Sequence, residues 1–128
     1  MSGIRAMPVL PVKDVVAAAE FYAGLGFDKG QYWGDPPAFC IMGLGTVTLA
    51  LQGAEDGKPG PENDLWSAYI YVDDVASLHD RFEAAGATIS DLRRDTPYGC
   101  DDFDLTDPDG HTIAFGQDRH PGPLGPGL

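Results

Sequence analysis

The feature that most constrains the fold of this 128-residue chain is an internal repeat. Val12–Val15 aligns with Val72–Val75 at an offset of about 60 residues, and the match continues through the residues that would form and end a helix. Farther along, Thr46–Leu49 aligns with Thr112–Phe115 at a slightly larger offset. Because the two segments match where a strand ends, where a helix begins and where it ends, the repeat predicts two copies of one structural module.

Each copy is expected to contain one helix. In the first copy, Asp14 is a good N-cap, and apolar side chains recur at helical spacing until Gly24. In the second copy, Asp74 takes the same place before a helix over about Val75–Ala85. Strand patterns before and after each helix make each copy a βαβββ module. We therefore predict an α+β fold in which two tandem modules form a curved mixed sheet with a ligand cleft.

The chain is expected to be a single domain, because its length is sufficient to bury a core without metals or disulfides. A polar segment rich in Gly and Pro predicts a linker between the modules, and a second Pro/Gly-rich segment predicts a flexible tail. The predicted parts of the domain, residues 1–128, are module one at about 5–52, the linker at about 53–64, module two at about 65–117 and the tail at about 118–128.

The formal net charge of −12 argues against nucleic-acid binding, which requires a positive surface. The charge is explained either by solubility or by attraction of a cationic small molecule. No apolar run approaches the ~18 residues of a membrane span, and the N-terminus lacks the apolar segment of a secretory signal. We expect a cytoplasmic protein in which Cys40 and Cys100 are buried, reduced thiols.

A hairpin is predicted over Pro97–Gln117, with Asp107–Gly110 as its turn. Asp102 and Asp104 alternate with apolar residues in its first strand, so both carboxylates lie on one face. That face is either a solvated strand surface or a source of negative charge around a cationic ligand. Tyr98 stands at the entrance of the strand, beside a flexible glycine.

The repeat and the hairpin resemble the vicinal oxygen chelate superfamily, which includes glyoxalase I, extradiol dioxygenases, and fosfomycin- and bleomycin-resistance proteins. Residues 8–27, 63–82 and 97–115 carry the resemblance and cover most of the chain. Within the superfamily, the chain is most similar to the antibiotic-binding, bleomycin-resistance branch. The resemblance implies a homodimer whose ligand lies in clefts at the subunit interface.

The metal-dependent enzymes of this superfamily take His or Glu ligands from inward-facing strand positions. The resemblance places those positions here at Met7, Thr48, Ser67 and Ala114. None of these residues is a usual ligand for a catalytic metal. The 3 histidines have no second ligand at a suitable spacing. We therefore predict no metal, no cofactor and no catalysis.

The predicted cleft is rich in aromatic side chains, which suit a planar, cationic or heteroaromatic ligand. The resemblance places binding-site aromatics of the bleomycin-binding proteins at Tyr98, at Phe39, and near Tyr32 and Trp33. The predicted ligand-binding residues are Tyr32, Trp33, Phe39, Trp66, Tyr98, Gly99 and Asp102. By contrast, Tyr69 and Tyr71 lie two residues apart in the clearest strand and are expected to pack in the core.

The resulting hypothesis is non-catalytic binding and sequestration of a bleomycin-type or other aromatic peptide antibiotic, which would confer resistance. One alternative is a metal-dependent lyase or dioxygenase of the same superfamily with displaced ligands. A second alternative is a binding module for another hydrophobic metabolite.

Overall fold

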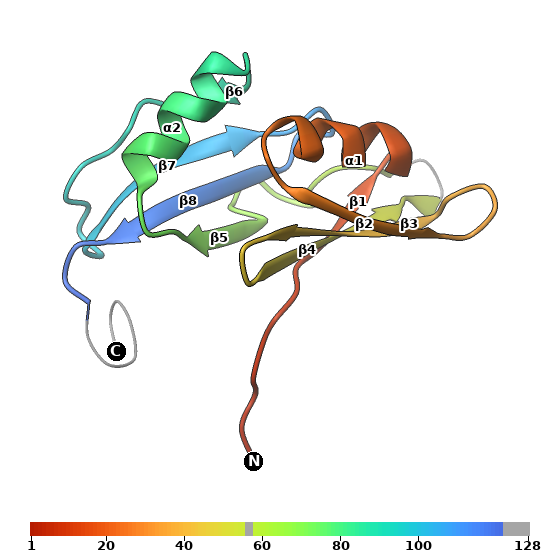
Figure 1. Ribbon diagram of the computed structural model, residues 1–128, viewed down its shortest axis with the longest axis horizontal. Coiled ribbons are helices and arrows are strands. Elements are labelled where there is room, and N and C mark those ends of the chain that lie inside the picture. The colour runs from red at the N-terminus through yellow and green to blue at the C-terminus, as the bar shows by residue number, and fades with distance from the viewer. Residues whose placement is uncertain (56–57, 122–128) are drawn as a thin grey trace.

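Two βαβββ modules follow one another in the computed structural model, which describes residues 1–55 and 58–121 (Figure 1). The first contains β1 (Val9–Val12), α1 (Val15–Gly24), β2 (Asp28–Trp33), β3 (Phe39–Leu44) and β4 (Val47–Gly53). The second contains β5 (Ala68–Tyr71), α2 (Val75–Ala84), β6 (Thr88–Ile89), β7 (Cys100–Thr106) and β8 (Thr112–Asp118). The predicted α+β architecture is confirmed. Most of the predicted tail, residues 122–128, lies outside the described residues.

Each module forms its own four-stranded mixed sheet, in the order β1-β4-β3-β2 and β5-β8-β7-β6. The first strand of each module pairs in parallel with the last, and the other pairs are antiparallel. Both helices lie on the same side of the two sheets (Figure 1). Each sheet therefore has a helix-covered face and an open face.

The two helices begin and end in the same way, as the repeat predicts. The Asp14 carboxylate accepts a hydrogen bond from the Ala17 N–H at 3.0 Å, and the Asp74 carboxylate accepts one from the Ser77 N–H at 3.1 Å. These contacts satisfy backbone donors that the first helical turn leaves unpaired. None of the described helices is long and apolar enough to cross a membrane.

The core is one apolar cluster that spans both modules. Phe103 and Phe115 stack between the second sheet and α2, with ring centroids 5.5 Å apart, and Phe82 packs on both. Phe27 of the first module contacts Phe115 at 6.4 Å. Because the rings pack across the boundary between the modules, the two halves share one core. Both cysteines are buried and free, as predicted.

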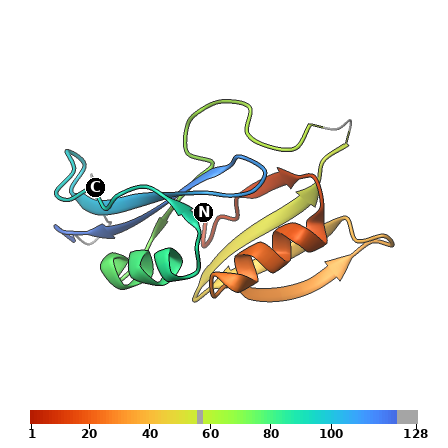
Figure 2. The ribbon, with the colours of Figure 1, turned by 90° about the horizontal axis from the view of Figure 1, so that it is seen from above.

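The turn Asp107–Gly110 joins the second module to the first. The buried Asp107 carboxylate accepts a hydrogen bond from the Tyr22 hydroxyl at 2.7 Å, and the Asp109 carboxylate accepts one from the Lys13 N–H at 2.9 Å. Figure 2 shows this end of the β7–β8 hairpin beside β1. The turn therefore holds the modules together, and its carboxylates are occupied by that contact.

Candidate functional site

Four aromatic side chains gather on the open face of the second sheet: Trp66, Tyr69, Tyr71 and Tyr98, here called the aromatic face. The Tyr69 ring lies at the centre, with centroids 4.9 Å from Trp66, 5.0 Å from Tyr71 and 6.2 Å from Tyr98. Trp66, Tyr71 and Tyr98 are 45%, 55% and 44% exposed. The ring faces are therefore available to a molecule that stacks on the sheet.

The expectation that Tyr69 and Tyr71 pack in the core is wrong. Successive side chains of a strand point to opposite faces. Ile70 takes the helix-covered face and is 4% exposed, so its two neighbours emerge on the open face. The sequence pattern shows that the two tyrosines share a face, but it does not say which face meets the core.

Asp102 lies beneath the aromatic face and is fully buried. One carboxylate oxygen accepts a hydrogen bond from Arg93 Nε at 2.6 Å. The other accepts from the Tyr69 hydroxyl at 2.9 Å and from the Tyr98 hydroxyl at 2.5 Å. Asp102 therefore touches no solvent, and it acts on the site by fixing the positions of two rings.

Asp104 continues this network along the same strand face. The Arg93 guanidinium donates bidentate hydrogen bonds to the Asp104 carboxylate at 2.8 and 3.1 Å, and Trp66 Nε1 donates to the same carboxylate at 3.0 Å. Arg93 reaches both carboxylates from the loop before β7. One guanidinium against two carboxylates leaves one formal negative charge beneath the rings. Of the two alternatives for this face, the solvated strand surface does not apply at Asp102, which is fully buried, and applies only in part at Asp104.

Burial raises the pKa of the Tyr69 phenol well above its ordinary value, and contacts with Cys100 and Asp102 raise it further. Burial and the hydrogen bond to Asp102 also raise the pKa of Tyr98. The hydrogen bonds to Asp104 raise the pKa of the Arg93 guanidinium. Both tyrosines are thus neutral hydrogen-bond donors near neutral pH, and the arrangement of the rings is stable there.

Gly116 in β8 makes room for the central ring. A Cβ atom at this position would lie 2.0 Å from the Tyr69 hydroxyl oxygen. Only glycine allows Tyr69 to lie across the neighbouring strand and reach Asp102. Sequence reasoning missed both Gly116 and Arg93. A glycine inside a strand pattern is a signal of close approach, and it could have indicated Gly116.

The predicted ligand-binding residues fall into three groups. Trp66, Tyr98, Gly99 and Asp102 lie together in the second module, where Gly99 has a φ of +85° in the turn before β7. Trp33 and Phe39 pair on the open face of the first sheet, with centroids 5.7 Å apart. Tyr32 packs against the core instead, and its hydroxyl has no hydrogen-bond partner in the described part of the chain.

The two described internal histidines have structural contacts. His111 Nε2 lies 2.6 Å from the Pro11 carbonyl, which can only accept, so Nε2 carries the proton. Nδ1 then accepts from the Ser67 hydroxyl at 3.2 Å. His79 Nε2 donates to the Ser90 carbonyl at 2.9 Å. Next to His111, a cavity of about 320 Å³ adjoins Trp66 and Ser67.

The family model of the Glyoxalase/Bleomycin resistance protein/Dioxygenase superfamily matches residues 5–115. The chain belongs to this superfamily. No curated protein sequence matches the chain.

Solved structures of the superfamily share the fold. A bleomycin-binding protein complexed with bleomycin has a TM-score of 0.76 and 22% identity, over 91% of this chain and 99% of that chain. The antibiotic-binding protein TnmS3 from Streptomyces sp. CB03234 has a TM-score of 0.75 and 23% identity, over 91% and 97%. The lactoylglutathione lyase from Agrobacterium tumefaciens has a TM-score of 0.68 and 21% identity, over 93% and 96%.

The residues at the four positions that the resemblance assigns to metal ligands do not fit a metal ion. Ala114 has no donor atom, and the Ser67 hydroxyl is engaged by His111. Met7 offers an exposed thioether, and the buried Thr48 hydroxyl has no hydrogen-bond partner among residues 1–55 and 58–121. The described part of the chain contains no group of three His, Cys, Asp or Glu side chains that could hold a metal ion. The donor set thus lacks the imidazoles and carboxylates that such metals require.

Proposed function

We propose that this protein binds an aromatic antibiotic of the bleomycin type and sequesters it without changing it chemically. The observation that carries the proposal is the aromatic face, in which Trp66, Tyr69 and Tyr98 are fixed by hydrogen bonds to buried or half-buried carboxylates. A resistance protein of this kind requires no covalent step, because stoichiometric capture lowers the free drug concentration by mass action.

The preorganisation of the rings favours tight binding. Trp66 Nε1 donates to the Asp104 carboxylate at 3.0 Å, and the Tyr98 hydroxyl donates to the Asp102 carboxylate at 2.5 Å. Both side chains remain partly exposed. A ligand that stacks on them meets side chains that are already immobilised, so little rotamer entropy is lost on binding. Flat rings with fixed edges therefore favour a planar, heteroaromatic ligand.

The charge of the site favours a cationic ligand. The layer beneath the rings keeps one formal negative charge after Arg93 is counted, and the chain as a whole carries −12. A negative field attracts a cation during approach, and the ring faces stabilise it by cation–π contacts after arrival. Antibiotic binding by proteins of similar fold supports the broader proposal that the ligand is an antibiotic.

The proposal includes a second copy of the chain. The exposed Trp33 pairs with the half-buried Phe39 on the first module, and no aromatic contact joins them to the aromatic face in the described residues. A homodimer that places this pair opposite the aromatic face of a partner would enclose a planar ligand on both sides. The buried free thiols support a reducing, cytoplasmic location for such a dimer.

The decisive experiment is isothermal titration of the purified protein with metal-free bleomycin. Saturable binding is expected, and Trp66→Ala or Tyr98→Ala should each weaken it by about 10- to 100-fold, the range for loss of one stacking ring. Val16→Ala removes an exposed apolar side chain from the helix side and serves as the matched control. Equal affinities in all four proteins would remove the stacking argument.

The second candidate is a metal-dependent lyase or dioxygenase, which the similar fold of the Agrobacterium tumefaciens lyase favours. Metal analysis of the purified protein separates the two candidates. A stoichiometric content of Zn, Fe, Ni or Mn would overturn the non-catalytic proposal. Saturable binding of an unrelated hydrophobic metabolite, with no response to bleomycin in a thermal-shift panel, would instead indicate a binding module for another hydrophobic metabolite.

A further inference from the structure

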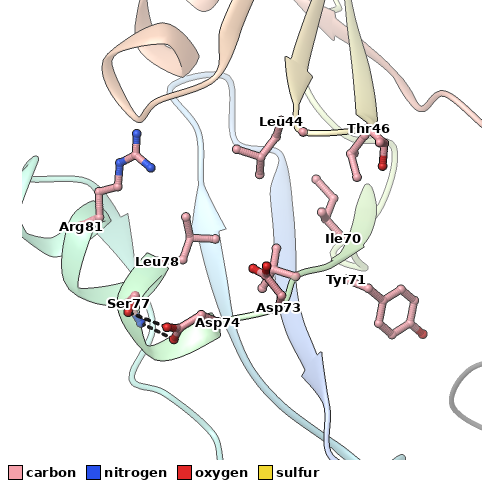
Figure 3. A pocket seen from close by; sticks show the side chains of 12 residues that line it. Leu44, Thr46, Ile70, Tyr71, Asp73, Asp74, Ser77, Leu78 and Arg81 are labelled. Carbon is pink, nitrogen blue, oxygen red and sulfur yellow. Dashed lines mark hydrogen bonds between the residues drawn. The ribbon is translucent and has the colours of Figure 1, made fainter. Parts of the chain in front are cut away.

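A cavity of about 550 Å³ lies where the two modules meet, between the β3–β4 turn, the end of β5 and α2 (Figure 3). Tyr71, at one edge of the aromatic face, also lines the cavity, whereas Trp66, Tyr69 and Tyr98 do not. Its volume lies within the range of small-molecule sites in proteins.

The wall of the cavity is apolar. Ile70 is buried, and Leu44, Val47, Val72 and Leu78 are half-buried against the core. Figure 3 shows the Leu44, Ile70 and Leu78 side chains around the space. Filling it with an apolar group would remove this surface from water, which is favourable by about 25 cal/mol per Å².

Helix α2 places opposite charges at the two ends of this wall. Asp74, Leu78 and Arg81 are spaced i, i+4 and i+7, so they lie on one helix face. Seven residues of helix span about 10 Å. Figure 3 shows Arg81 at one end, Asp73 and Asp74 at the other, and Leu78 between them.

Gly26 of the first module leaves room for the Arg81 guanidinium. A Cβ atom on Gly26 would lie 2.0 Å from Nη2 of Arg81, and Gly26 has a φ of +105°, so the backbone conformation favours glycine there. Within the described residues, neither Arg81 nor Asp73 makes an ion pair. Asp74 differs, because it caps α2 through Ser77.

We propose that this cavity binds a short, extended, apolar peptide with free termini. The peptide ammonium group lies at Asp73 and Asp74, its carboxylate lies at Arg81, and its central side chain covers Leu78. Three extended residues span about 10 Å, which matches the separation of the charges along α2. The proposed peptide site shares Tyr71 with the aromatic face and none of its other three residues.

The test is titration of the full chain, labelled with ¹⁵N, with the tripeptide Ala-Leu-Ala, followed by amide chemical shifts. Saturable shifts are expected in the β3–β4 turn and in residues 72–78, and none on β7. Arg81→Gln and Asp73→Asn should each weaken binding about fivefold, the magnitude of one partly exposed ion pair. Arg5→Gln and Asp91→Asn remove exposed charges elsewhere and should leave the affinity unchanged.

Peptides with one blocked end test the charges from the ligand side. The N-acetylated peptide and the C-terminal amide should each bind about fivefold more weakly than Ala-Leu-Ala. Equal affinity of the free and blocked peptides, or of Arg81→Gln and the unaltered protein, would overturn the proposal. The absence of saturable shifts at the cavity would overturn it as well.

Discussion

Gly116→Ala is expected to displace the central ring of the aromatic face. The new Cβ atom would lie 2.0 Å from the hydroxyl oxygen of Tyr69 and 2.6 Å from the ring carbon that carries it. Backbone in a paired strand cannot move far, so the tyrosine must swing away. It then loses its 2.9 Å hydrogen bond to Asp102 and its edge contact with Trp66.

The cost follows from these losses. A hydrogen bond to a charged acceptor contributes about 1.5–3 kcal/mol, and Tyr69 belongs at the lower end because it is only half-buried. The lost ring contact adds about 0.5–1.5 kcal/mol, and the reduced freedom of the unfolded chain returns about 0.5 kcal/mol. We expect the free energy of unfolding to fall by about 2 kcal/mol and Tm to fall by roughly 8 °C.

Urea denaturation followed by tryptophan fluorescence measures this change, and a double-mutant cycle identifies its cause. In a Tyr69→Ala background there is no ring to displace, so Gly116→Ala should cost close to nothing there. Gly53→Ala is the matched control, since its Cβ would meet no atom closer than 3.6 Å. If Gly116→Ala costs the same with and without the Tyr69 ring, the steric reasoning is refuted.

Three further predictions concern the buried hydroxyls and carboxylates. Asp102→Ala should lower the free energy of unfolding by about 3 kcal/mol in urea, because the half-buried Arg93 guanidinium and two tyrosine hydroxyls lose this buried acceptor; a loss below about 1 kcal/mol would contradict this. Tyr22→Phe should lower thermal stability by about 1–2 kcal/mol, because buried Asp107 loses a donor, and an unchanged Tm would count against that contact. The raised pKa values of Tyr69 and Tyr98 mean that their stabilising effect is complete below about pH 10 and is lost as the pH rises through their folded values. Phenolate absorbance should therefore show late-titrating tyrosines, and ionisation of all 5 tyrosines together near pH 10 would be inconsistent with this network.

The modules and helices were predictable because their signals are local. A capping carboxylate, an apolar face and a terminating glycine occur within a dozen residues of one another, and the repeat supplies each signal twice. Asp14 and Asp74 cap α1 and α2 as predicted. The turn at Asp107–Gly110 was predicted for the same reason, although its role in joining the modules depends on distant residues.

The site was only partly predictable, because it depends on contacts between strands that are distant in sequence. Tyr98 and Asp102 belong to one hairpin, and their proximity follows from the sequence. Tyr69 joins them only because β5 pairs in parallel with β8, which brings it over Gly116. Arg93 was missed because nothing local distinguishes a loop arginine that bridges two carboxylates from a solvated one.

The hydrogen bond from Tyr22 to Asp107 also distinguishes the two halves of the repeat. Phe82 occupies the position in the second module that Tyr22 occupies in the first. Only the first half therefore carries the hydroxyl that donates to the Asp107 carboxylate. Two identical copies of either half could not form this contact. The two halves are therefore not interchangeable at this contact, because one supplies the donor and the other supplies the acceptor.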